Sequence, residues 1–136
     1  MFRLFSAAVF AAFLTFSVPT SSALAAAVVA KVDLSQQKMR VYVGGKHRYT
    51  WAVSTGRGGY RTPTGSYSVK RMHKMWYSRK YYNSPMPYSL FFRGGYAVHG
   101  TKALSKLGRP ASHGCIRLHP SNAAALYKLA RRYGGG

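Results

Sequence analysis

The reactive side chains of this sequence gather in one stretch, residues 99–118. The 136-residue chain has a single cysteine, Cys115, with His113 two residues before it, Arg117 two residues after it and His99 sixteen residues before it. A thiolate is a strong nucleophile, and a neighbouring imidazole can take the proton of a thiol. This pattern predicts nucleophilic catalysis by Cys115. Either histidine could serve as the base, and the spacing alone does not choose between them.

The residues around the cysteine also predict a local geometry. If residues 112–118 are extended, side chains two positions apart share one face of the strand. Cys115 then points the same way as His113 and Arg117, towards a polar and reactive face. Gly114 lets another group approach the main chain closely, which an oxyanion hole built from main-chain N–H groups requires.

Two other interpretations of the same residues stand beside catalysis. A lone cysteine is often a small buried hydrophobic residue without chemistry. A zinc site is the second alternative, with ligands drawn from His99, His113, Cys115 and His119. The chain lacks a Cys-x-x-Cys pair or another recognised zinc-ligand spacing, so catalysis is the preferred interpretation.

The charge balance is extreme and limits the possible chemistry. The chain has 21 lysines and arginines and one acidic residue, Asp33, which gives a formal net charge of +20. Glycoside hydrolysis by paired carboxylates and carboxylate-bound Mg²⁺ or Ca²⁺ sites both need more acids than this. A catalytic histidine is therefore expected to be oriented by a main-chain carbonyl or an amide side chain. The positive surface should attract polyanions.

The first 25 residues are typical of a secretory signal peptide. A short basic start, Met1–Arg3, precedes an uncharged and mostly apolar run over residues 4–18, and Ala23-Leu24-Ala25 is a small-x-small cleavage site. As a helix the run is about 22 Å long, short of the roughly 30 Å of a bilayer core. We predict cleavage after Ala25 and export of residues 26–136 to the periplasm or cell envelope, with membrane contact only during export. Export makes nucleic acid a poor partner.

The remaining chain is predicted to form one mostly β domain that ends in a helix. Residues 30–53 alternate apolar and polar side chains around Gly44-Gly45, which predicts a hairpin or meander. Pro85 and Pro87 discourage regular structure in the basic and aromatic stretch 70–96, which is expected to be a surface segment or the wall of a groove. Further elements are a helix capped by Ser121 at 122–133 and strands at 66–72, 88–92 and 96–98.

The sequence resembles a known family. His99-Gly100-Thr101, followed by Ser112-His113-Gly114-Cys115-Ile116-Arg117-Leu118, is similar to the signature of the L,D-transpeptidase catalytic domain. Three earlier segments, residues 32–37, 54–56 and 62–65, are also similar to this family. The resemblance covers residues 30–133 of the 26–136 domain, and it implies a mostly β, sandwich-like fold with a C-terminal helix.

The resemblance also implies roles for individual residues. Cys115 matches the nucleophile and His99 the general base, whose other ring nitrogen is held by the carbonyl of Gly100. The main-chain N–H groups of His113, Gly114 and Cys115 would line the oxyanion hole, with His113 also shaping the site. The expected substrate contacts are Ser112, Thr101 and Arg117, and Arg117 would contact either a substrate carboxylate or the main chain of the motif itself. No metal and no organic cofactor is implied.

The implied activity is an acyl transfer on bacterial peptidoglycan, in cell-wall cross-linking and remodelling. Cys115 would form a thioester with the third residue of a tetrapeptide stem, release the terminal D-alanine and pass the acyl group to an amine of another stem or of an envelope protein. The positive surface is expected to hold anionic glycan strands and stem carboxylates in place of a wall-binding domain. The enzymatic alternative is hydrolysis, as in an L,D-carboxypeptidase, and the non-enzymatic one is a basic wall-binding protein.

Overall fold

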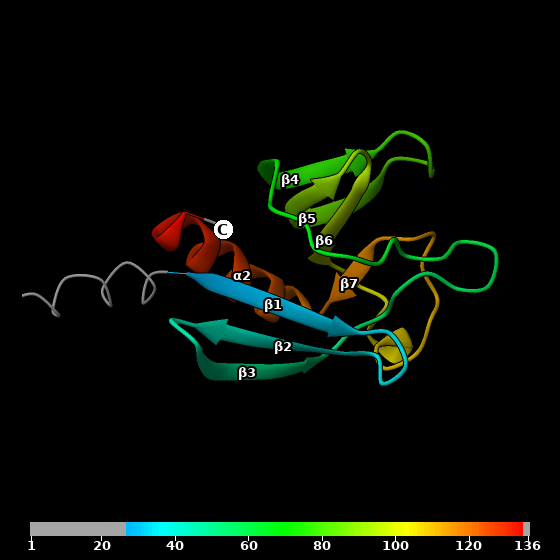
Figure 1. Cartoon of the computed structure of the whole chain (residues 1–136). Helices are drawn as coiled ribbons and strands as arrows, with labels where there is room; N and C mark the ends of the chain where they lie inside the picture. The colour runs from blue at the N-terminus through cyan, green and yellow to red at the C-terminus, as the bar shows by residue number, and fades with distance from the viewer. Residues whose placement is uncertain (1–26, 135–136) are drawn as a thin grey trace, which may run out of the picture.

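Two β-sheets and a C-terminal helix make up the computed structural model, which describes residues 27–134 (Figure 1). The first sheet has the order β1-β2-β3 and consists of β1 (Val28–Asp33), β2 (Lys38–Val43) and β3 (Lys46–Ala52). The second has the order β4-β5-β6-β7 and consists of β4 (Arg71–Ser78), β5 (Ser84–Arg93), β6 (Tyr96–Gly100) and β7 (Ile116–Leu118). A short 3-10 turn, η2 (Leu104–Lys106), precedes β7, and α2 (Pro120–Tyr133) follows it. The predicted mostly β fold is confirmed; the predicted signal peptide, residues 1–25, lies outside the described residues.

The first sheet is the predicted meander. Its strands pair antiparallel, and Gly44 and Gly45 join β2 to β3 with φ angles of 60° and 81°. Two successive positive φ angles suit the tight turn of a hairpin, and glycine adopts them without steric cost. Along β2, Met39 and Val41 are fully buried while Lys38 is exposed, so the alternation in the sequence matches the inner and outer faces of the sheet.

The second sheet contains the connection that builds the site. β4, β5 and β6 pair antiparallel, whereas β7 runs parallel to β6 with Val98 opposite Ile116. The chain between these parallel strands, residues 101–115, therefore has to cross over and return beside the end of β6. An isolated bridge between Ser54 and Arg117 ties β7 to the end of the first sheet.

The stretch 70–96 differs from the expectation of an irregular surface segment. β4 and β5 form a long hairpin, and Pro85 and Pro87 lie inside β5, opposite Tyr77 and Met75. β6 pairs only with the later part of β5, from Leu90 onwards, so the prolines sit where one edge of β5 is open. A proline lacks the N–H that a neighbouring strand would accept, and an open edge requires none.

The strand predicted at 66–72 is also wrong. Residues 66–70 belong to no strand, and β4 begins only at Arg71. The hydroxyl of Tyr67 donates to the carbonyl of Thr64 at 2.6 Å, which folds this segment back on itself, and the N–H of Lys70 meets the carbonyl of Phe91 at 2.7 Å. The strands predicted at 88–92 and 96–98 are confirmed as parts of β5 and β6.

Helix α2 packs on β5, β6 and β1 and closes the space between the sheets (Figure 1). The helix is confirmed, but its cap is His119 and not the predicted Ser121, because the Nδ1 atom of His119 accepts the N–H of Ser121 at 3.1 Å. Within residues 27–134, no helix has the length and apolarity needed to cross a bilayer. The core joins both sheets and the helix through Met39, Val41, Val53, Leu90, Phe92, Ile116, Leu118, Ala123, Leu126 and Ala130.

Candidate active site

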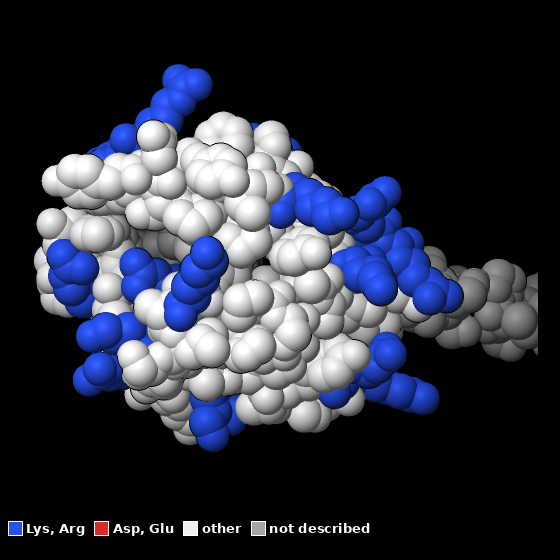
Figure 2. Space-filling view, turned by 180° about the vertical axis from the view of Figure 1, so that it is seen from behind, with Lys and Arg blue, Asp and Glu red and all other residues white. Residues whose placement is uncertain are grey.

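A single cleft of about 940 Å³ gathers most of the side chains predicted to take part in chemistry. Figure 2 shows a hollowed face of the molecule with lysine and arginine side chains around the hollow and no acidic residue in view. The β4–β5 hairpin forms one wall of the cleft, and the loops around β6 and β7 form the other. Six predicted site residues line it: His99, Thr101, Ser112, His113, Cys115 and Arg117.

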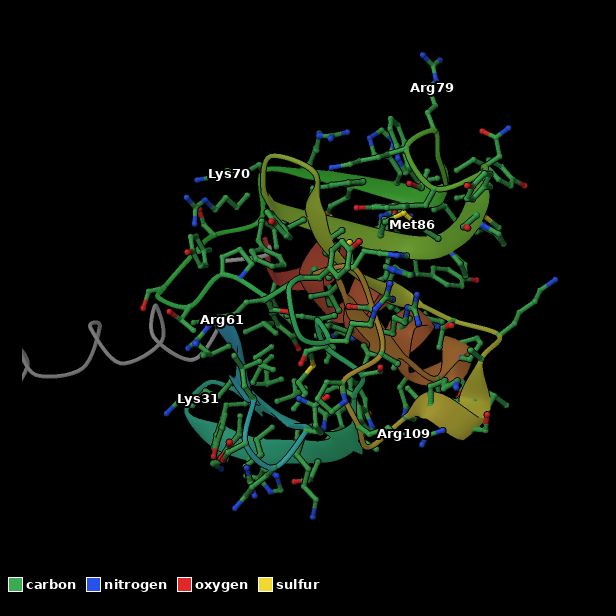
Figure 3. All side chains as sticks on the ribbon, turned by 90° about the vertical axis from the view of Figure 1, so that its right-hand side faces the viewer. Lys31, Arg61, Lys70, Arg79, Met86 and Arg109 are labelled. Carbon is green, nitrogen blue, oxygen red and sulfur yellow. The ribbon has the colours of Figure 1, made fainter. Side chains whose placement is uncertain are left out.

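The charges in this cleft are all positive. The only acidic residue of the chain, Asp33, is absent from the cleft; its Oδ1 atom accepts the N–H and the hydroxyl of Ser35, at 2.9 and 2.6 Å. Arg79, at the β4–β5 turn, points away from the body of the molecule (Figure 3). Because the chain provides no carboxylate here, an acidic ligand would be attracted. The cations that line the cleft are Arg61, Arg71, Arg79, Lys80, Lys102 and Arg117.

The parallel pairing of β6 and β7 brings the predicted pair together. His99 lies opposite Arg117, and Cys115, two residues earlier, packs against Ala97. His99, Cys115 and Arg117 all line the same cleft.

The imidazole of His99 is buried, with 6% of its surface exposed, and is held by its neighbour in sequence. Its Nδ1 atom lies 2.7 Å from the carbonyl oxygen of Gly100. A carbonyl can only accept, so Nδ1 carries the proton and Nε2 keeps a lone pair. Burial lowers the pKa of His99 to about 4, and the charge of Arg117 adds to this, while the bond to Gly100 works in the opposite direction. The ring is therefore neutral at neutral pH.

The thiol of Cys115 is half-buried and lines the cleft. It lies in an apolar cluster with Met86, Phe91 and Ala97, and its Sγ atom donates to the carbonyl of Gly95 at 3.8 Å. Burial raises the pKa of Cys115, whereas a hydrogen bond from the main chain of Ala97 and the charge of Arg117 lower it by smaller amounts. The resting thiol is therefore protonated and faces a neutral imidazole.

His113 has a different environment from His99. Its ring stacks on Tyr81, with centroids 4.0 Å apart and planes within 6°, and meets the edge of Tyr60 at 4.8 Å. The Nε2 atom of His113 accepts a hydrogen bond from Arg57 Nη2 at 3.2 Å, since a guanidinium can only donate. Partial burial and the charge of Arg57 lower the pKa of His113. Its lone pair is thus occupied, and its ring fixes the β4–β5 turn over the cleft.

Internal hydrogen bonds hold the loop that carries the cysteine. The hydroxyl of Ser112, which is 1% exposed, donates to the carbonyl of Cys115 at 2.6 Å and accepts the N–H of Gly114 at 3.0 Å. Ser112 therefore supports the loop from within. The N–H of Gly114 is thereby engaged within the loop.

Gly114 interrupts the extended segment predicted for 112–118, which is a strand only over Ile116–Leu118. Its φ of +124° is a conformation that side chains rarely adopt, and a Cβ atom there would lie 2.5 Å from the ring of Tyr96. Glycine is therefore required on both counts. Thr101, the remaining predicted contact, is 9% exposed, and its hydroxyl accepts the N–H of Ala103 at 3.1 Å.

The sequence analysis did not single out Arg57, Tyr81 or Thr62. The first two hold His113, and Thr62 contacts the cysteine loop. The aromatic stretch 70–96 indicated a groove wall, but nothing in it distinguished Tyr81 from its neighbours. Of the four zinc ligands considered, His119 caps α2, and no group of three potential metal ligands lies together within residues 27–134.

The chain matches the model of a known protein family. The model of the L,D-transpeptidase catalytic domain matches residues 27–132. The chain belongs to this family. The comparison with curated proteins gave no match.

Solved structures of L,D-transpeptidases share the fold of this domain. An L,D-transpeptidase from Mycobacterium smegmatis matches with a TM-score of 0.70 and 23% identity, over 74% of this chain and 53% of that one. One from Stackebrandtia nassauensis matches with a TM-score of 0.67 and 32% identity, over 74% and 49%. L,D-transpeptidase 3 from Mycobacterium tuberculosis, in complex with a faropenem-derived adduct, matches with a TM-score of 0.66 and 27% identity, over 75% and 55%. The chain therefore spans about half the length of these proteins.

Proposed function

We propose that this chain is an exported L,D-transpeptidase in which Cys115 is the nucleophile and His99 the general base. Its donor substrate is a peptidoglycan tetrapeptide stem. The sulfur attacks the carbonyl of the third residue and forms a thioester, and the amide bond to the terminal D-alanine breaks. The membership of the chain in the L,D-transpeptidase family supports this reaction class.

His99 Nε2 takes the thiol proton as the sulfur attacks and gives it to the departing nitrogen of D-alanine. An acceptor amine then attacks the thioester, passes a proton to His99 and restores the thiol of Cys115. The site pairs a protonated thiol with a neutral imidazole, so the proton moves during the attack and no thiolate has to exist beforehand.

The observation that carries this proposal is the bond between His99 Nδ1 and the carbonyl of Gly100, at 2.7 Å. It leaves the Nε2 lone pair of His99 free to accept a proton, and His99 lines the same cleft as Cys115. The corresponding lone pair of His113 is taken by Arg57. The structure therefore supports the choice of His99 as base, for which the spacing gave no preference.

The positive cleft favours substrates that carry carboxylates, and stem peptides do. Arg117, in the same cleft as Cys115, is the expected contact for a carboxylate close to the scissile bond, and Thr101 also lines this cleft. The reaction takes place on the cell wall, so the proposal includes export by the predicted signal peptide and action in the periplasm or cell envelope.

The test is incubation of the purified domain with tetrapeptide-stem muropeptides. Wild type is expected to release D-alanine, while Cys115→Ala releases none and His99→Gln is slowed at least about 100-fold, as for loss of a general base. His47→Gln, a change at an exposed histidine of β3 outside the cleft, is the matched control and retains activity. Equal release by wild type and Cys115→Ala would refute the proposal.

The products of the same assay identify the acceptor. A cross-linked dimer of stems indicates transpeptidation between stems, whereas a tripeptide product indicates hydrolysis. Repeating the assay with an amine-bearing envelope protein tests the third acceptor, because a successful transfer adds the mass of the acyl group to that protein.

A further inference from the structure

Thr62 connects the first half of the chain to the loop that carries Cys115. Its side chain is 3% exposed, and its hydroxyl donates to the carbonyl of Gly114 at 2.8 Å. The same hydroxyl accepts the N–H of Gly56 at 2.9 Å. Both hydrogen-bonding capacities of this buried group are therefore used, and one of them acts on the residue before the nucleophile.

The carbonyl of Gly114 and the N–H of Cys115 belong to one peptide unit. A peptide unit is planar, so a group that fixes the direction of the C=O also fixes the direction of the N–H on its opposite side. Ser112 already bonds the N–H of Gly114 and the carbonyl of Cys115. The peptide unit between these two residues is the one that Ser112 does not hold.

Gly114 is the position at which this peptide unit could most easily turn. Its φ is +124°, and glycine has the greatest conformational freedom of all residues. Without an external bond, the unit between Gly114 and Cys115 can rotate about that glycine. The hydroxyl of Thr62 supplies the bond, and Gly56, bridged to Ser112, anchors Thr62 in turn.

We propose that Thr62 is a positioning residue that aims the main-chain N–H of Cys115 at the oxyanion formed during acyl transfer. This inference rests on the proposed function. Thr62 does not touch the substrate in this account, and it acts only through the peptide unit that it bonds. Loss of the Thr62 hydroxyl should therefore slow only those reactions in which a carbonyl oxygen becomes negatively charged.

Two reactions of the same thiol separate this role from general support of the loop. Faropenem is attacked at a lactam carbonyl and needs an oxyanion site, whereas iodoacetamide is attacked at a saturated carbon and develops no oxyanion. Thr62→Val is expected to slow acylation by faropenem about 10- to 100-fold, since complete removal of one oxyanion donor costs about 100- to 1,000-fold and a misdirected donor loses only part of that. Its alkylation by iodoacetamide should stay within about two-fold of wild type.

Thr62→Ser restores the hydroxyl and is expected to recover acylation to within a few-fold of wild type. Thr55→Val is the matched control, because Thr55 is equally buried, with 3% exposed, and its hydroxyl accepts from Gln37 and makes no bond to the cysteine loop. If Thr62→Val does not fold, as judged by circular dichroism, Thr62→Ala removes the hydroxyl without added bulk and serves in the same comparison.

The ratio of the acylation rate to the alkylation rate decides the result. A selective fall of this ratio in Thr62→Val, reversed in Thr62→Ser and absent in Thr55→Val, supports the proposal. An equal fall of both rates would show that Thr62 only supports the loop, and no fall would show that it has no role; either overturns the inference. Failure of the proposed function itself is distinct, because wild type would then not be acylated at all.

Discussion

The Nδ1–H of His99 and the carbonyl oxygen of Gly100 form a 2.7 Å hydrogen bond between neighbours in sequence. In a chain with one acidic residue, this contact does what a carboxylate does in many catalytic triads: it sets the tautomer and the orientation of the ring. A carbonyl has no negative charge to stabilise an imidazolium, so burial lowers the pKa of His99 to about 4 without an opposing ion pair.

This pKa has a consequence for stability. An unfolded histidine has a pKa near 6.5, so between about pH 6.5 and pH 4 the unfolded chain binds a proton at His99 that the folded chain does not. The free energy of unfolding therefore falls as the pH drops through this range, by about 3 kcal/mol from this residue. Urea unfolding at pH 7 and pH 4 measures the fall in wild type and in His99→Gln. The decrease in the free energy of unfolding from pH 7 to pH 4 should be smaller in His99→Gln than in wild type by about 3 kcal/mol. An equal decrease in both proteins would contradict the low pKa of His99.

The environment of Cys115 predicts how the reactivity of its thiol depends on pH. Burial raises the pKa of Cys115, so the rate of alkylation by iodoacetamide should keep rising above pH 8.5 and show no plateau near neutral pH. The charge of Arg117 lowers this pKa, and Arg117→Gln should therefore move the profile to higher pH. A plateau near pH 6 would instead indicate a preformed thiolate–imidazolium pair.

Tyr81 is expected to control access to the cleft through its stacking on His113. Tyr81→Leu removes a parallel contact at 4.0 Å that holds the β4–β5 turn over the cleft, and we expect the KM for the stem peptide to rise several-fold with little change in kcat. Tyr77 on β4 is 54% exposed and lies outside the cleft, so Tyr77→Leu is the matched control and should leave KM unchanged. Equal effects of the two substitutions would exclude a specific role for the stack.

The positive surface should govern binding to the cell wall. Binding to isolated sacculi is expected to weaken steeply between 50 and 500 mM salt, because the screening length falls from about 14 to about 4 Å over that range. Cys115→Ala serves for this measurement, since it leaves the charge unchanged while preventing turnover. Salt-independent binding would contradict the idea that these charges hold the wall polymer.

Local patterns predicted much of the fold. Gly44-Gly45 between alternating strands indicated the first hairpin, and an apolar stripe that ends at glycine indicated α2. Pro85 and Pro87 misled the analysis of the second sheet, because their tolerance depends on which edge of β5 lacks a neighbour. That is a property of the tertiary arrangement, and the local sequence does not contain it.

The site also contains residues that the local sequence indicated and residues that only the tertiary arrangement brings together. The types and spacing of the residues pointed to Cys115, His99, His113 and Arg117, and the resemblance to the family added Thr101 and Ser112. The structure places these six residues around one cleft. Arg57 and Thr62 contact this stretch from more than 50 positions earlier in the chain, and Tyr81 comes from the β4–β5 turn. Their contacts exist only once the two sheets have packed, so spacing along the sequence did not indicate them.

The central claim is that Cys115 forms a thioester with the stem peptide. The most direct measurement is the intact mass of the protein after brief incubation with a tetrapeptide stem and rapid acid quench, followed by peptide mapping. The account predicts an added mass equal to the stem minus D-alanine, located on Cys115, with one D-alanine released per adduct and none in Cys115→Ala. Release of D-alanine with no adduct on Cys115, at the same rate in Cys115→Ala, would contradict it.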